Sequence, residues 1–223
     1  MMKRIVIAGA LIAAGLVSAD ARLPKEEPTP HYLERAAMFK KEGVKAGAVV
    51  FLGDSQTEGG DWAELTGLPD VVNRGIIGDT SEGIAERLSD VTDGKPSKIF
   101  LLCGVNDVSH AIPADSVAMS IIDVVKRIHA ESPETKVYLQ SLLPINNSFG
   151  RYSRIKDKEP VVREINAILA AEAPALDVTW INLYPLFTDA DGNLRSELTT
   201  DGLHLKPEGY RIWGSIIKPY ATE

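Results

Sequence analysis

Cysteine is almost absent from this chain, which has one, Cys103, among 223 residues. A single cysteine cannot form an internal disulfide, so stability must come from the packed core even in an oxidising compartment. Because Cys103 lies inside an apolar run, we interpret it as a small buried hydrophobe rather than a nucleophile. No cysteine stands directly after the apolar N-terminal run, which gives no support to a lipid-modified anchor.

Positive charge is also scarce, with 24 Lys and Arg against 31 Asp and Glu and a net charge of −7. A moderately acidic protein is a poor candidate for binding nucleic acid or anionic membrane by charge. The sequence also lacks internal repeats and long low-complexity tracts. A hydrophobic content of 44% over this length is typical of one globular domain with a sizeable core.

The N-terminus resembles a secretory signal. Lys3 and Arg4 precede an apolar run over residues 5–17, and Ala19-Asp20-Ala21 forms an A-x-A cleavage site. A membrane anchor or a buried first helix is the alternative, but the apolar run is short for a full span. We expect an exported protein, periplasmic or secreted, without a stable membrane anchor after cleavage. The expected organisation is a signal peptide over 1–21, an N-terminal extension and helix over 22–47, and one domain over 48–223.

Five apolar segments are expected to form strands, and helical patterns separate them. The expected strands are Ala48–Leu52, Val71–Val72, Lys98–Cys103, Lys136–Gln140 and Val178–Asn182. The expected helices are Tyr32–Lys41, Ser116–Ala130, one opened by Pro160 and one opened by Pro207. Alternating strands and helices predict an α/β fold, with a parallel sheet covered on both faces in a three-layer α/β/α sandwich.

Small polar residues follow the first expected strand as Gly53-Asp54-Ser55. Parallel α/β sheets bind their ligands at the carboxyl ends of strands, so Ser55 is a candidate nucleophile, although a serine here is often only a helix cap. A serine hydroxyl needs a base within hydrogen-bond reach. His204 precedes a helix and has Asp201 three residues upstream, which can orient the imidazole. In isolation this pair is better interpreted as a turn and a solvent-facing loop residue.

An ester oxygen becomes negative in the tetrahedral intermediate, so hydrogen-bond donors must converge on it. Three candidates lie just past expected strands: the backbone N–H of Ser55, the backbone N–H of Gly78 and the side-chain amide of Asn106. Glycine at position 78 lets the backbone approach a substrate closely. We expect the segment from Gly78 to Ser81 to be a turn and a helix cap as well, because capping and donation use different groups.

Together these segments resemble the SGNH, or GDSL, hydrolase family. Its motifs read GDS, a glycine after the second strand, GxND and DxxH, and all four occur in this order between about residues 48 and 215. The resemblance implies a five-stranded parallel sheet with the flavodoxin-like strand order. It also implies a nucleophile at Ser55, an orienting acid at Asp201, a base at His204 and oxyanion donors at Ser55, Gly78 and Asn106. No cofactor and no metal ion are implied.

The polar loop over residues 145–154 follows the fourth strand at the expected active edge, where long loops carry specificity. Asn146, Arg151 and Tyr152 suit a sugar ring, although an ordinary solvated loop is an equal alternative. We count Asp54 as a further candidate substrate contact, beside its interpretation as a structural acceptor. Leu142-Leu143-Pro144 and Asn73-Arg74-Gly75 look similar to the branch of platelet-activating-factor acetylhydrolases and carbohydrate O-acetylesterases.

The sequence thus predicts an exported esterase that removes short acyl groups, most of all acetyl, from sugars. A lysophospholipase or thioesterase of the same family is the first alternative. A non-catalytic domain that binds sugar or peptidoglycan is the second, because fold alone does not prove activity. A flavodoxin-like nucleotide binder is disfavoured because Asp54 would repel phosphate. We interpret the acidic segment Asp189–Asn193 as a surface turn rather than a calcium loop, and His31 as a surface residue.

Overall fold

A five-stranded parallel sheet forms the centre of the protein, and the computed structural model describes residues 27–223. The expected signal peptide over residues 1–21 lies outside this part of the chain. The strand order is β2-β1-β3-β4-β5. The strands are β1 (Val49–Gly53), β2 (Val71–Gly75), β3 (Lys98–Leu102), β4 (Lys136–Gln140) and β5 (Thr179–Ile181). All four neighbouring pairs are parallel, which confirms the predicted α/β class and the flavodoxin-like order.

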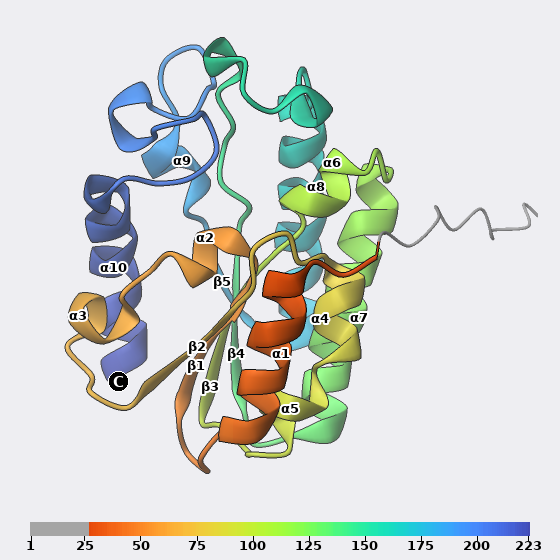
Figure 1. Cartoon of the computed structure of the whole chain (residues 1–223), viewed down its shortest axis with the longest axis vertical. Helices are drawn as coiled ribbons and strands as arrows, with labels where there is room; N and C mark the ends of the chain where they lie inside the picture. Colours follow the sequence, from red (N-terminus) through yellow and green to blue (C-terminus); the bar gives the residue numbers. More distant parts are fainter. Residues whose placement is uncertain (1–26) are drawn as a thin grey trace, which may run out of the picture.

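Helices cover both faces of the sheet (Figure 1). One face carries α3 (Trp62–Thr66), α9 (Tyr184–Phe187) and α10 (Pro207–Thr222). The other carries α4 (Ser81–Glu86), α5 (Ser89–Thr92), α7 (Ala114–Glu131) and α8 (Glu159–Glu172). The N-terminal helix α1 (Pro30–Glu42) lies beside α4, where the Tyr32 hydroxyl donates to Gly83 O at 3.4 Å. No helix within residues 27–223 is long and apolar enough to cross a membrane.

Strand residues alternate between two separate apolar cores, because successive side chains point to opposite faces of a sheet. Val50, Leu52 and Leu101 pack under α7 and α8. Phe51 and Phe100 face the other way, toward α3 and α10. On that face aromatic rings stack across three neighbouring strands, with centroids 4.1 Å apart for Trp62–Phe51, 4.8 Å for Phe51–Phe100 and 4.5 Å for Phe100–Tyr138. The central strands are therefore fixed rigidly from both sides.

Element ends differ modestly from the expected ones. Strand β2 continues to Gly75, Cys103 lies buried one residue beyond β3, and β5 is shorter than expected. The sequence patterns did not indicate the short helices that follow the strands, because segments of four to six residues hold too little of a 3.6-residue period to register. Two of these, α2 (Ser55–Glu58) and α6 (Val105–Ser109), lie at the carboxyl edge of the sheet.

Candidate active site

The strand β1 delivers Ser55 to the carboxyl edge of the sheet. Gly53 ends the strand in register with Gly75 of β2 and Leu102 of β3. A side chain at position 53 would lie 2.2 Å from Leu102 O, so only glycine allows the chain to turn here. Asp54 then caps α2 by accepting a 2.9 Å hydrogen bond from Gln56 N. Because Asp54 supplies the cap, the Ser55 hydroxyl is left for other contacts.

Ser55, His204 and Asp201 form a continuous hydrogen-bonded relay. Ser55 Oγ lies 3.0 Å from His204 Nε2, and His204 Nδ1 lies 2.8 Å from Asp201 Oδ2. These partners place the imidazole proton on Nδ1, where it faces the carboxylate, and leave Nε2 to accept from the serine hydroxyl. The arrangement has the geometry that nucleophilic serine chemistry requires. The structure therefore brings together three residues that span 149 positions of the chain.

The loop before α10 holds both the acid and the base in place. Thr199 Oγ1 donates to His204 O at 2.7 Å, and Asp201 Oδ1 accepts from the backbone N–H groups of Leu203 and His204 at 2.9 and 2.8 Å. Partial burial alone would raise the pKa of Asp201. The hydrogen bonds from the His204 side chain and from these two backbone groups outweigh burial and hold the pKa at about 2. Asp201 is therefore ionised at neutral pH.

Tyr152 contacts the same relay from the side opposite the serine. Its hydroxyl donates to Asp201 Oδ2 at 3.0 Å and lies 3.2 Å from His204 Nδ1, and its ring meets the imidazole edge to face at 5.7 Å. Burial raises the pKa of Tyr152, and the bond to Asp201 adds to this effect. The hydroxyl is thus a neutral donor committed to the acid of the relay.

The three expected oxyanion donors follow the neighbouring strands β2, β1 and β3. Ser55 begins α2, Gly78 lies in the turn after β2, and Asn106 lies in α6 after β3. Within residues 27–223, neither Ser55 N–H nor Gly78 N–H donates to another protein group. Asn106 Nδ2 donates to Asp79 O at 2.8 Å, which fixes the amide and leaves its second hydrogen for the site. The sheet therefore gathers these donors at one edge.

The Gly78 turn has the geometry of a type II turn. Asp79 N donates to Ile76 O at 3.1 Å, and Gly78, at the third position, has a φ of 82°. A Cβ at Gly78 would meet nothing within 4 Å, so the turn faces open space. The expected helix cap is also present, because Thr80 Oγ1 accepts from Gly83 N at 3.1 Å at the start of α4.

Buried acids surround this edge without facing the solvent. Asp79 pairs with Arg87 at 2.8 Å, and Asp107 accepts from both the N–H and the hydroxyl of Ser81. Burial raises the pKa of Asp54 to about 7 and that of Asp79 to about 6, and it also raises the pKa of Asp107. These groups tie the strand ends and the loops to one another.

Two of the expected substrate contacts, Asp54 and Asn146, are buried in the structure. Asp54 is fully buried with its carboxylate turned to the start of α2. Asn146 is 8% exposed, donates to Leu194 O at 2.7 Å and accepts from Ser148 N at 3.1 Å, so its amide stabilises its own loop. The half-buried Tyr152 donates its hydroxyl hydrogen to Asp201, and Arg151 is exposed.

Sequence reasoning missed a second polar network at this edge. His31 is not an isolated surface residue, because its Nε2 lies 2.9 Å from Glu58 Oε1. Glu58 Oε2 accepts from Ile77 N at 2.7 Å, one residue before Gly78. A carboxylate three residues after Ser55 was the available signal, but its partners come from distant segments. Within residues 27–223, no three His, Cys, Asp or Glu side chains gather as metal ligands.

Known proteins share this architecture. A curated relative, platelet-activating factor acetylhydrolase IB subunit alpha2 from Gallus gallus, is 28% identical over 178 residues, which are 77% of this chain and 73% of the relative. A solved GDSL-like lipase from Bacteroides thetaiotaomicron VPI-5482 is 28% identical with a TM-score of 0.75, covering 84% of this chain and 96% of that one. An acetyl xylan esterase, 24% identical with a TM-score of 0.64 over 78% of this chain and 98% of that one, shares the fold.

The family profile described as GDSL-like lipase/acylhydrolase matches residues 51–212. The matched range begins inside β1 and ends inside α10, so it includes every residue of the Ser55, His204 and Asp201 relay and all three candidate oxyanion donors. The chain belongs to the GDSL-like lipase/acylhydrolase family.

Proposed function

We propose that this protein is an exported serine esterase that removes short acyl groups, above all acetyl, from carbohydrate esters. The observation that carries the proposal is the relay of Ser55, His204 and Asp201, with hydrogen-bond lengths of 3.0 and 2.8 Å. Export rests on the signal-like sequence of residues 1–21 alone.

In the first half of the reaction, Ser55 Oγ attacks the ester carbonyl carbon while His204 Nε2 takes the hydroxyl proton. Asp201 stabilises the imidazolium that forms. The carbonyl oxygen gains the negative charge and accepts hydrogen bonds from Ser55 N–H, Gly78 N–H and the Asn106 amide. When the intermediate collapses, the bond to the alcohol oxygen breaks and His204 returns its proton to that oxygen. The alcohol leaves, and the acyl group stays on Ser55.

In the second half, water replaces the alcohol. His204 Nε2 takes a proton from the water as its oxygen attacks the acyl carbon, and the same three donors stabilise the second tetrahedral intermediate. The bond to Ser55 Oγ then breaks, His204 returns the proton to the serine, and the free acid leaves. Protons and charges balance over the cycle within the relay.

The preference for a short acyl group has two supports. The curated relative with 28% identity is named an acetylhydrolase, and the loop after β4 presents polar groups such as Arg151 at the rim. A longer acyl chain is the second candidate, because Ile77 beside Gly78 is 53% exposed and offers apolar surface next to the oxyanion donors. Lysophospholipid and thioester substrates belong to this second candidate.

Hydrolysis of p-nitrophenyl esters of increasing acyl length, together with a panel of acetylated sugars, tests the proposal. We expect the acetate to be turned over fastest and Ser55→Ala to lose at least about 1000-fold in kcat. Faster turnover of long-chain esters would instead favour the second candidate, a lysophospholipase or thioesterase. An unchanged rate in Ser55→Ala, or failure of a serine-directed organophosphonate to label Ser55, would exclude the serine mechanism.

A further inference from the structure

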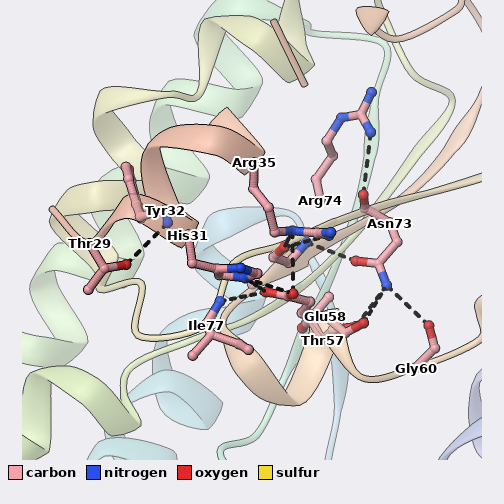
Figure 2. A network of polar contacts seen from close by, with 12 residues as sticks. Thr29, His31, Tyr32, Arg35, Thr57, Glu58, Gly60, Asn73, Arg74 and Ile77 are labelled. Atoms are coloured by element: carbon pink, nitrogen blue, oxygen red, sulfur yellow. Dashed lines mark hydrogen bonds and ion pairs between the residues drawn. The ribbon is translucent and has the colours of Figure 1, made fainter. Parts of the chain in front are cut away.

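Glu58 joins the nucleophile helix to the turn that carries Gly78 (Figure 2). It is the last residue of α2, three positions after Ser55. Its Oε2 accepts from Ile77 N at 2.7 Å, and its backbone N and Cα lie so close to Gly75 that a Cβ there would be 2.2 and 2.6 Å away. One residue therefore contacts both the strand that leads into the turn and the second residue of the turn itself.

The direction of the Gly78 N–H depends on this turn. In a type II turn, the central peptide, which here joins Ile77 to Gly78, is flipped relative to a type I turn. The bond from Asp79 N to Ile76 O and the bond from Asn106 to Asp79 O fix the later side of the turn. On the earlier side, Ile76 N donates to Gly53 O at 3.1 Å, and Glu58 supplies the side-chain acceptor for Ile77 N at 2.7 Å.

Helix α1 holds the Glu58 carboxylate. His31 Nε2 lies 2.9 Å from Oε1 and 3.1 Å from Oε2, and Arg35 Nε lies 3.5 Å from Oε1. Arg35 also donates twice to Gly75 O, at 3.1 and 3.0 Å. An unpaired carboxylate beside an oxyanion site would repel the developing charge, and the Arg35 guanidinium offsets that charge. Figure 2 shows His31 and Arg35 converging on Glu58 from α1.

We propose that Glu58 is a positioning residue for the Gly78 oxyanion donor, and that His31 and Arg35 of α1 hold it in place. Helix α1 ends at Glu42, before the matched family range begins at residue 51. A segment outside that range therefore helps to shape the active site. The inference rests on the proposed esterase function, because it assigns Glu58 a role in that same oxyanion site.

The test compares Glu58→Ala, Glu58→Gln and a matched control, Glu42→Ala. Glu42 is an acid of α1 whose Oε2 lies 3.2 Å from Nη1 of Arg74 in β2, and no hydrogen bond joins it to the turn. Steady-state kinetics on p-nitrophenyl acetate give kcat and KM separately. Titration with methylboronic acid, which forms a tetrahedral anion on the serine, reports oxyanion binding without turnover.

We expect Glu58→Ala to lower kcat about 10- to 100-fold and to weaken boronate binding by a similar factor, with KM changed less than about threefold. Glu58→Gln should recover most of the loss, because its amide oxygen can accept from Ile77 N. Glu42→Ala should leave kcat and boronate affinity unchanged. A kcat in Glu58→Ala within about twofold of wild type, or equal losses in Glu58→Ala and Glu42→Ala, would overturn the inference.

The outcome is separable from that of the esterase proposal. If wild type and Ser55→Ala hydrolyse the acetate equally, the serine mechanism fails whatever Glu58 does. If Ser55→Ala is inactive and Glu58→Ala is fully active, the esterase proposal stands and the positioning role fails. Thermal unfolding of each variant identifies any loss of kcat that merely follows a loss of folded protein.

Discussion

Tyr152 donates its hydroxyl hydrogen to Asp201 Oδ2 at 3.0 Å, the same oxygen that faces His204 Nδ1 at 2.8 Å. The carboxylate of Asp201 thereby shares its charge among a phenol, an imidazole and two backbone N–H groups. A donor that competes for this oxygen moderates the attraction between the acid and the base. Tyr152 therefore contacts both the acid and the imidazole of the relay.

Replacing Tyr152 by Phe should move the acidic limb of the kcat/KM profile to higher pH, by roughly 0.5 to 1 pH unit. Without the phenol, Asp201 presents more negative charge to His204 and favours the imidazolium, which cannot act as a base. The measurement is kcat/KM for p-nitrophenyl acetate between pH 5 and 9. Tyr138→Phe is the control, because that hydroxyl bonds Glu223 away from the relay. Superimposable Tyr152→Phe and wild-type profiles would refute the coupling.

Asn106 is expected to contribute through a neutral donor. Asn106→Ala should lower kcat by about 100- to 1000-fold with little change in KM, the usual cost of one oxyanion donor. Asn106→Asp should be at least as damaging, because a carboxylate beside Asp79 O repels both that carbonyl and the developing oxyanion. Single-turnover kinetics of acylation isolate the step. Full activity in the Asp variant would show that this side chain does not face the oxyanion.

Two glycines at this edge should fail for different reasons. In Gly78→Ala the new Cβ meets no atom within 4 Å, but a φ of 82° costs alanine about 1 kcal/mol and favours a flipped turn. We expect kcat to fall about 10- to 100-fold because the Gly78 N–H is displaced. The free energy of unfolding should stay close to that of the wild type. In Gly53→Ala the Cβ would lie 2.2 Å from Leu102 O, so folding itself should suffer. Chemical denaturation and kcat, measured on both variants, distinguish a loss of activity from a loss of stability. Equal destabilisation of Gly78→Ala and Gly53→Ala would contradict the prediction.

Stability should fall as pH rises from about 4 to 7. Burial raises the pKa values of Asp54, to about 7, and of Asp79 and Asp107 above those of the unfolded chain. The native state then binds more protons than the unfolded state between these pH values, so the free energy of unfolding decreases as pH rises. Asp201, with a pKa lowered to about 2, contributes to stability with the opposite pH dependence. Its contribution is lost only as pH falls from about 4 toward 2.

Asp54→Asn should flatten this fall, because the amide keeps the acceptor for Gln56 N and has no charge to bury. The difference in unfolding free energy between pH 5 and pH 8 should shrink by about 1 to 4 kcal/mol. Guanidinium unfolding at the two pH values measures it, and Asp123→Asn, an exposed acid on α7, should leave the difference intact. An unaltered difference in Asp54→Asn would mean that Asp54 is not the titrating group.

The strand pattern made most of this edge predictable. Parallel strands end on one side of a sheet, and the strand order implied by the family resemblance makes β1, β2 and β3 neighbours, so polar residues that follow them are expected to lie near one another. That reasoning placed Ser55, Gly78 and Asn106 on one rim before any contact was known. The base and acid were harder, because only their order in the chain and the DxxH spacing connected them with Ser55.

The loop after β4 and the α1 contacts could not be read in the same way. A polar side chain such as Asn146 serves a ligand or its own backbone with equal ease, and composition does not distinguish the two uses. The pairing of His31 with Glu58 depends on how α1 packs against β2, which no local period records. The structure therefore shows Asn146 bonded within its own part of the chain and adds a second polar network beside Ser55.

Asn146 N donates to Gly202 O at 2.8 Å, and a Cβ on Gly202 would lie 2.2 Å from Asn146 O. The loop that begins at Asn146 and the segment that carries His204 are therefore in close backbone contact. A variant in which residues 146–158 are replaced by the loop of another protein, to change selectivity, would therefore need residues 199–204 of that protein as well. In a chimera that exchanges the loop alone, we expect His204 to be displaced from Ser55 even if the substrate preference changes.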